Sequence, residues 1–314
     1  MGPDLSALLD EPLEVVGANP PPRGDRILVG LAPDASRPDL AARLDVTLVP
    51  PGTVAGPEFV VSADPEADAE ALRQAAQANP QAALVLAQVL RAGGVDVGSA
   101  LDLESFAYST LLGGAEFARW LEGRGPRPLP PPSAEPVRVA RAGAELSITL
   151  NRPERRNAYG REVRDALVEA LRLAELDESI ERVVLTGAGP SFSAGGDLDE
   201  FGTTPDLTTA HFVRTRGGAG LLLHRLAAKA EVHVHGSCVG AGIELPAFAG
   251  RVIARPGTTF RLPEVGMGLI PGAGGTVSIP RRVGRWRTLF FALSGRPMDT
   301  TTALEWGLID ELDG

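Results

Sequence analysis

The chain of 314 residues carries a net charge of −10 and an apolar fraction of 44%, which is ordinary for a globular protein with a buried core. The negative charge argues against binding along a nucleic-acid backbone, and no apolar run reaches the roughly 18 residues that a membrane span needs. Its single cysteine, Cys238, excludes an internal disulfide and fits a reducing compartment, so we predict a cytoplasmic protein that binds neither nucleic acid nor membrane.

The N-terminal part of the chain predicts two pieces. Residues 1–62 are expected to form an N-terminal extension, a small α/β unit in which strands at 26–31 and 46–49 flank a short helix. Residues 63–132 carry apolar residues at helical spacing. The helices predicted there are 68–91 and 103–123.

A proline-rich stretch at 126–136 predicts an extended linker before a C-terminal core at 137–314. Strands and helices alternate in this core, which indicates the α/β class with a parallel or mixed sheet covered by helices. The strands are expected at 137–142, 144–150, 182–186, 232–235 and 252–254, followed by a segment at 258–261. The helices are expected at 159–175, at 211–228 and from about 243.

Two glycine-rich loops in the core each follow a strand and lead toward a helix. They are FSAGGDL at 192–198 and HGSCVGAGIEL at 235–245. Small residues let the backbone approach a ligand closely, and free N–H groups at a helix start attract an oxyanion. Either loop alone could be a tight turn, but two such N–H groups converging on one carbonyl oxygen would stabilise an enolate.

Five stretches of the core resemble, in order and spacing, the signature stretches of the crotonase (enoyl-CoA hydratase/isomerase) superfamily. They are LNRPERRNAY (150–159), FSAGGDLDEF (192–201), VHGSCVGAGIEL (234–245), LPEVGMGLIPGAGGT (262–276) and ALEWGLIDEL (303–312). The resemblance covers about residues 137–312. It implies an α/β fold, a crotonase-like ββα-superhelix core with a helical oligomerisation segment, and an acyl-CoA thioester as the ligand.

The resemblance also implies how the thioester is held. The backbone amides of Gly196 and Ala241 would form the oxyanion hole, and the carbonyl of Ala194 would accept from the adenine amino group. Most family members have glycine where Ala241 stands; alanine keeps the N–H but restricts φ. Arg155 and Arg156 follow the strand end where the family's CoA cleft begins, so at least one of them should contact CoA phosphates. The alternative is that both are solvated surface arginines.

Two glutamates stand at the positions that hydratases of this family use, Glu244 and Glu264. Adding water across a conjugated double bond requires a base for the water and an acid for the α-carbon. The resemblance therefore implies an enoyl-CoA hydratase-like lyase that needs no metal and no cofactor beyond the substrate's CoA. The alternatives are another crotonase reaction (isomerase, decarboxylase, hydrolase or cofactor-independent oxygenase) or a catalytically quiet scaffolding subunit. Ala241 and Pro246, which depart from the family pattern, leave the last one open.

The helical segment before the core resembles one that family members usually carry after it. Residues 64–92 and 103–128 are similar to the family's C-terminal segment, which covers the active site and builds a trimer. The simplest interpretation is a circular permutation with 126–136 as the new connection, and the alternative is an unrelated helical extension beside a truncated core. Permutation predicts a homotrimer or a dimer of trimers. It also predicts that a set of apolar residues is buried: Phe106, Leu111, Phe117, Trp120 and Leu121.

Overall fold

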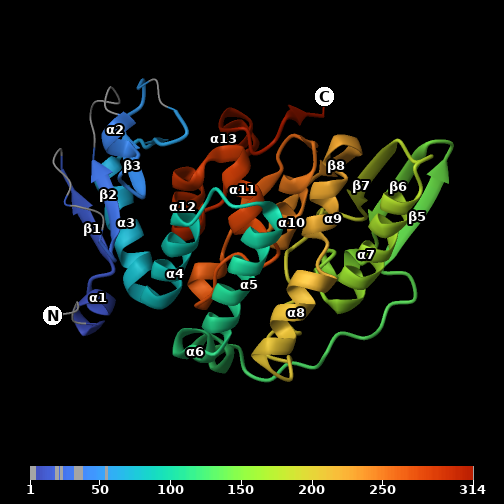
Figure 1. The fold of residues 1–314 in the computed structure, drawn as a ribbon, viewed down its shortest axis with the longest axis horizontal. Helices are drawn as coiled ribbons and strands as arrows, with labels where there is room; N and C mark the ends of the chain where they lie inside the picture. The colour runs from blue at the N-terminus through green and yellow to red at the C-terminus, as the bar shows by residue number, and fades with distance from the viewer. Residues whose placement is uncertain (1–4, 18–20, 22–23, 32–37, 54–55, 314) are drawn as a thin grey trace.

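The computed structural model describes residues 5–17, 21, 24–31, 38–53 and 56–313. Two main sheets lie at opposite ends of the molecule, and helices fill the space between them (Figure 1). None of the described helices is both long and apolar enough to cross a membrane.

The N-terminal sheet has four parallel strands in the order β1-β2-β3-β4. Its two central strands are short runs of mostly β-branched and leucine residues that are almost entirely buried, as a covered parallel sheet requires. Asp45, the residue before β3, accepts hydrogen bonds from Leu28 N and from Arg91 Nε, both at 2.9 Å, and so ties the sheet to the helices that follow. The elements are α1 Leu5–Asp10, β1 Leu13–Val16, β2 Ile27–Leu31, α2 Pro38–Ala41, β3 Val46–Val49 and β4 Val60–Val61.

Four helices follow where the sequence predicted two. They are α3 Pro65–Ala78, α4 Pro80–Arg91, α5 Val97–Leu112 and α6 Ala115–Arg124. The prediction of unbroken helices at 68–91 and 103–123 is wrong, because Pro80 interrupts the first and a glycine pair interrupts the second. Proline cannot donate the next helical hydrogen bond, and Asn79 before it takes a non-helical φ of −141°.

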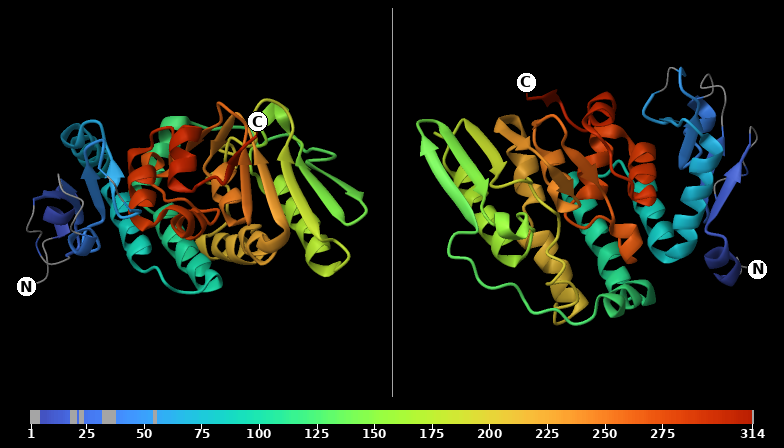
Figure 2. Two further views of the ribbon diagram at one scale, coloured as in Figure 1. Left: turned by 90° about the horizontal axis from the view of Figure 1, so that it is seen from above. Right: turned by 180° about the vertical axis from the view of Figure 1, so that it is seen from behind.

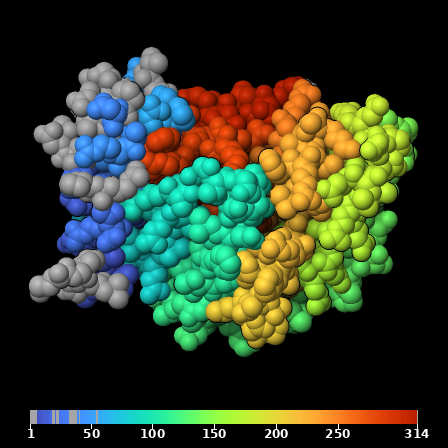
Figure 3. All heavy atoms as spheres, in the orientation of Figure 1, coloured from blue at the N-terminus to red at the C-terminus, as the bar shows by residue number. Residues whose placement is uncertain are grey.

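Helices α3 to α6 pack onto the core (Figures 1 and 2). Helices α3 and α4 contact α12, and α5 contacts α8 and α11. Leu72, Leu86 and Phe117 are buried in the same apolar cluster as Leu289 and Phe291 of α12. Figure 3 shows α4 to α6 joining the surface of the core without a break.

One of the predicted burials in this segment is wrong. Phe106 is 59% exposed. Its ring stacks on His211 of α8, with 4.2 Å between ring centroids. Of the other four residues, Leu111 and Phe117 are buried, and Trp120 and Leu121 are partly buried against the core cluster.

The core sheet has six strands in the order β12-β10-β8-β7-β6-β5. β5 and β6 form an antiparallel hairpin, and the other neighbours pair in parallel, so the sheet is mixed. β9 and β11 form a separate parallel pair. The strands are β5 Val137–Ala142, β6 Glu145–Leu150, β7 Arg182–Gly187, β8 Ala230–Val234, β9 Ser237–Val239, β10 Arg251–Ala254, β11 Thr259–Arg261 and β12 Glu311–Leu312.

The core helices depart from prediction at one place. The single helix expected at 211–228 is wrong, because Gly218 leaves the helical region with ψ 149° and separates α8 from α9. The α-helices are α7 Arg161–Leu176, α8 Leu207–Gly217, α9 Gly220–Arg225, α10 Ala241–Glu244, α11 Gly275–Val283, α12 Arg285–Ser294 and α13 Thr300–Trp306. Short 3-10 turns occupy Pro153–Arg155, Ala227–Lys229, Pro246–Phe248 and Glu264–Met267.

Candidate active site

A cavity of about 500 Å³ opens between helix α5 and the core, and α8 forms part of its wall. Four residues predicted from the sequence line it together: Gly196, Ala241, Glu244 and Glu264. Helix α5 contributes further lining residues that the sequence did not indicate, among them Leu101, Glu104, Ser105 and Tyr108. The cavity is therefore closed by a segment that lies far from the glycine-rich loops in the sequence.

The first glycine-rich loop is fixed from behind by Asn157. This side chain is fully buried, and its Nδ2 donates at 2.8 to 3.0 Å to three carbonyls, those of Ala188, Ser191 and Phe192. Ser193 Oγ donates to the Asn157 carbonyl at 2.8 Å. In the sequence Asn157 stood only as one letter of a signature stretch, so its positioning role emerges from the structure.

The second glycine-rich loop lies directly against the first. Ser193 and Cys238 form a parallel bridge between them. Gly195 has a φ of 88°, and a Cβ there would lie 2.5 Å from the carbonyl oxygen of Val239. Only glycine fits at such a close approach with a positive φ.

Two backbone amides at this junction are available to a ligand. Gly196 and Ala241 both line the cavity, and their N–H groups donate to no acceptor within the described part of the chain. Ala241 is the first residue of α10, where helix geometry leaves the N–H without a partner. Two free donors in one cavity are what a thioester carbonyl oxygen would require, and the oxyanion-hole assignment stays a prediction.

The Glu244 carboxylate is buried and held by the start of α11. Its Oε2 accepts hydrogen bonds from Ala273 N at 2.7 Å and Gly275 N at 2.9 Å. Burial raises the pKa of Glu244 well above its usual value, and the charges of Glu264 and Glu104 add to this rise. The two amide hydrogen bonds act in the opposite direction and favour the ionised form.

Glu264 faces the same cavity from the start of a 3-10 turn. Its Oε2 is buried and has no hydrogen-bond partner among the described residues. A Cβ on Gly240 would lie 2.4 Å from Glu264 Oε1 and 3.6 Å from Glu244 Oε1, so both carboxylates lie beside this glycine. Burial raises the pKa of Glu264 to about 8.

A third carboxylate in the cavity wall, Glu104, was missed by the sequence analysis. Its two oxygens accept from Gly274 N at 2.8 Å, from Thr276 N at 2.9 Å and from Thr276 Oγ1 at 2.7 Å. Burial raises the pKa of Glu104 to about 7, although these hydrogen bonds act to lower it. Glu104 and Glu244 thus take alternate amides of one helix start, which fixes the loop that orients Glu244.

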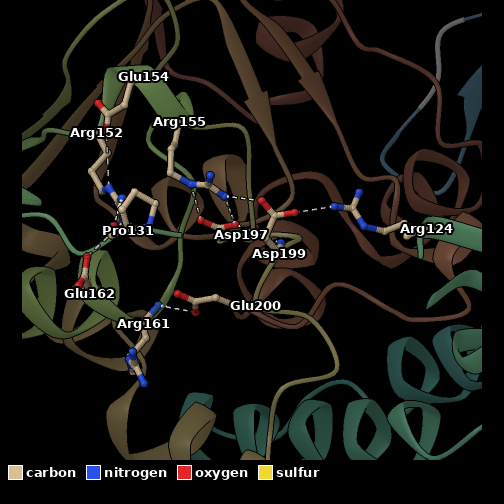
Figure 4. Close-up of polar contacts among 10 residues, drawn as sticks. All are labelled: Arg124, Pro131, Arg152, Glu154, Arg155, Arg161, Glu162, Asp197, Asp199 and Glu200. Atoms are coloured by element: carbon tan, nitrogen blue, oxygen red, sulfur yellow. Dashed lines mark hydrogen bonds and ion pairs between the residues drawn. The ribbon is translucent and has the colours of Figure 1, made fainter. Parts of the chain in front are cut away.

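The guanidinium of Arg155 binds two carboxylates, those of Asp197 and Asp199 (Figure 4). Its Nε and Nη2 donate to Asp197 at 2.9 and 2.6 Å, and Nη2 also donates to Asp199 at 2.9 Å. These partners raise the pKa of Arg155. Arg124 of α6 reaches the same Asp199 at 2.8 Å, so the network joins α6 to the first glycine-rich loop.

Arg156 and Ala194 lie beside each other but outside the lining of the cavity. The carbonyl of Arg156 accepts from Ala194 N at 2.9 Å, and Arg156 itself is exposed with a φ of 52°. Of the three residues predicted to contact CoA, the structure brings these two together and turns the guanidinium of Arg155 toward Asp197 instead. CoA contact stays a prediction for all three.

We expect the two arginines to behave differently when each is replaced by alanine. Arg155→Ala leaves Asp197, which is 3% exposed, without its cation and should lower the free energy of unfolding by about 3 kcal/mol. Arg156→Ala should preserve stability and weaken CoA binding by about 1.5–3 kcal/mol. Chemical denaturation and calorimetric titration with CoA measure the two effects. Unchanged CoA affinity in both variants would remove both arginines from the CoA site.

The known proteins that resemble this chain match its core. A family model for enoyl-CoA hydratase/isomerase matches residues 142–314. The chain is 37% identical over 169 residues to the 1,2-epoxyphenylacetyl-CoA isomerase of Escherichia coli, covering 52% of this chain and 64% of that protein. It is 35% identical over 174 residues to the 2,3-dehydroadipyl-CoA hydratase of the same bacterium, covering 55% and 68%. The chain therefore spans about two thirds of the length of these relatives.

Solved structures show the same partial match. An enoyl-CoA hydratase from Thermoplasma volcanium superposes with a TM-score of 0.53 at 30% identity, covering 57% of this chain and 72% of that one. An enoyl-CoA hydratase from Mycobacterium smegmatis gives a TM-score of 0.52 at 29% identity, covering 56% and 69%. The predicted α/β fold class, with a core of the crotonase type, is confirmed by these matches.

Proposed function

Because this chain belongs to the enoyl-CoA hydratase/isomerase family, we propose that it adds water across the conjugated double bond of a 2-enoyl-CoA thioester. The observation that carries this proposal is the pair of buried carboxylates, Glu244 and Glu264, in one cavity with two free amides. Moving a double bond can be done by one group that carries a proton, whereas hydration needs a base and an acid. One of the two relatives above is itself named as a hydratase.

The proposed reaction uses only the substrate and this chain's own groups. The thioester carbonyl oxygen would accept from Gly196 N and Ala241 N. Glu244 would take a proton from water as the water oxygen bonds to the β-carbon, and the double-bond electrons would move into an enolate at the carbonyl. Glu264 would then give its proton to the α-carbon. The product is a 3-hydroxyacyl-CoA, and a proton passing from Glu244 to Glu264 would restore the site.

The contacts of the two glutamates support this division of roles. Glu244 receives two amide hydrogen bonds, which stabilise a carboxylate and suit a base. Glu264 Oε2 receives none from the described residues, so a negative charge there has little to stabilise it. Two neighbouring buried carboxylates resist carrying two charges at once. Burial raises the pKa of both carboxyl groups, but only Glu244 has two amide donors to stabilise its charge, so we assign the proton at neutral pH to Glu264.

We expect kcat/KM for hydration to fall as the pH rises through about 8. The pKa of Glu264 is raised to about 8, so above that pH the group loses the proton that the α-carbon needs. Because this folded-state pKa lies above the usual value, ionisation at high pH also disfavours the folded state. Initial rates measured across this range test the expectation, with the residual activity of Glu264→Gln as the control that should lack this alkaline decline. A profile that stays flat beyond pH 9 would contradict the assignment.

Hydration itself is tested by following the loss of the conjugated enoyl absorbance over a chain-length panel of 2-enoyl-CoA thioesters. Mass spectrometry should show a product heavier by one water. A product of unchanged mass would indicate an isomerase. Tight thioester binding without turnover would indicate a binding or scaffolding subunit.

We also infer that residues 63–132 occupy the place of the helical segment that family members carry after the core. In support, α5 lines the cavity, Glu104 holds the start of α11, and Arg124 of α6 joins the first glycine-rich loop. By the same inference the chain assembles as a homotrimer or a dimer of trimers. A cytoplasmic location remains our proposal from the cysteine content.

A further inference from the structure

One wall of the cavity carries a partly buried arginine, Arg214 of α8. Its Nε donates to Ser105 Oγ at 3.0 Å, and its Nη2 donates to the Ser105 carbonyl at 3.2 Å and to Ser109 Oγ. The centre of the guanidinium lies 4.7 Å from the centroid of the Tyr108 ring. Three residues of α5 therefore fix the position and plane of this cation.

The groups that hold Arg214 are all electrically neutral. Among the residues that the structure describes, no carboxylate oxygen lies within 4.0 Å of the Arg214 guanidinium, the distance of an ion pair. Its Nη1 donates to no acceptor among them. Glu104 interacts with Arg214 at longer range, but both of its oxygens are taken by Gly274 and Thr276. Arginine stays protonated in proteins. The cavity wall thus presents a fixed positive charge with one free nitrogen.

The Tyr108 ring links Arg214 to the reacting end of the cavity. A Cβ on Gly272 would lie 2.3 Å from Tyr108 Cδ2, so the ring packs directly on the loop after Glu264. Tyr108, Glu244 and Glu264 all line this cavity. Because Gly196, Ala241 and Arg214 line the same cavity, we infer that an acyl chain whose thioester lies at the two glycine-rich loops extends toward Arg214.

We propose that Arg214 makes this site selective for acyl-CoA thioesters whose acyl chain ends in a carboxylate. The proposal rests on the proposed function only in that it places the thioester at the glycine-rich loops. The terminal carboxylate would accept from Nη1 and supply the negative charge that the surroundings of Arg214 lack. A charge-assisted hydrogen bond in a partly dehydrated cavity is strong, and a methyl terminus would leave the cation without a partner.

A purely structural role for Arg214 makes a different prediction. Its hydrogen bonds to Ser105 and Ser109 also join α8 to α5, so replacing it could loosen the cavity wall. Loosening would impair thioesters with charged and uncharged termini alike. The ratio between the two therefore separates selectivity from support.

The test uses the full chain and pairs of 2-enoyl-CoA thioesters of equal length, one ending in a carboxylate and one in a methyl group. We expect the unmodified protein to prefer the carboxylate member in kcat/KM by about 10- to 100-fold. Arg214→Met should reduce this ratio to near one. Arg214→Lys should keep part of it, because the charge remains without the fixed fork. Arg216→Gln is the matched control, since Arg216 is an exposed arginine of the same helix, and it should leave the ratio unchanged.

Binding of saturated acyl-CoA pairs, measured by calorimetry, gives a readout that needs no hydration. If the enoyl thioesters are not hydrated but the saturated carboxylate member binds more tightly in an Arg214-dependent way, the hydratase proposal fails and the selectivity stands. Equal affinities and equal kcat/KM for both members in the unmodified protein overturn the selectivity. So does an equal loss for both members in Arg214→Met. If Arg214→Met does not fold, the test rests on the ratio of kcat/KM between the carboxylate and methyl members. The selectivity then requires this ratio to exceed one in the unmodified protein and to fall in Arg214→Lys.

Discussion

Replacing Glu244 or Glu264 by glutamine is expected to lower kcat for hydration of a 2-enoyl-CoA by about 10²–10⁴-fold in each variant. Glutamine matches the shape of glutamate but can neither accept the proton of water nor give one to the α-carbon. Thioester binding should persist, because the amides of Gly196 and Ala241 are untouched. Rates follow from the loss of enoyl absorbance, and affinities from titration with a saturated acyl-CoA.

The surroundings of the two glutamates show why these replacements should leave the fold intact. A glutamine carbonyl at position 244 can still accept from Ala273 N and Gly275 N. A glutamine at position 264 replaces a group that is neutral below its pKa of about 8, so no buried charge is lost. Glu305→Gln, on the exposed side of α13, controls for the substitution itself and should keep full activity. Near-full activity in either active-site variant would rule out the two-glutamate mechanism.

The parts of the site that lie in continuous motifs could be predicted from the sequence. Gly196, Ala241, Glu244 and Glu264 occur in glycine-rich or proline-flanked stretches whose spacing restricts what the backbone can do, and all four line one cavity. The strands of the core were predictable for a similar reason, because short apolar runs between glycine turns leave little choice of structure.

The rest of the site could not be predicted because it depends on contacts between distant segments. Glu104 and Arg214 lie on helices, where isolated charged residues usually face solvent. Only the packing of α5 onto α11 buries Glu104, and only the packing of α5 against α8 gives Arg214 its partners. Arg155 is the opposite case, a residue that the sequence placed at the ligand and that the fold engages with other side chains. Its place beside a ligand loop suggested a phosphate contact, but Asp197 and Asp199 were close enough in the fold to engage it.

A chain limited to residues 137–314 is expected to lose its cooperative fold and to aggregate. Removing α5 and α6 would uncover the apolar surface that Leu111 and Phe117 cover. It would also remove the hydrogen bonds that Glu104 accepts from Gly274 N and Thr276 N, and so loosen the start of α11. Circular dichroism during thermal unfolding and size-exclusion chromatography measure the loss.

Rejoining the missing helices at the other end should restore the protein. In the rearranged chain, residues 64–132 follow Gly314 through a flexible glycine-serine linker and the connection at 126–136 is cut, as a permutation at exposed ends allows. A second version carries residues 1–132 in the same place, because α3 packs against the N-terminal sheet and would otherwise lose that cover. We expect the second version to be soluble, to hydrate the same thioesters and to have the oligomeric state of the original chain. A stable and active 137–314 fragment would show that the helices are an accessory extension, and failure of both rearranged chains would contradict the permutation.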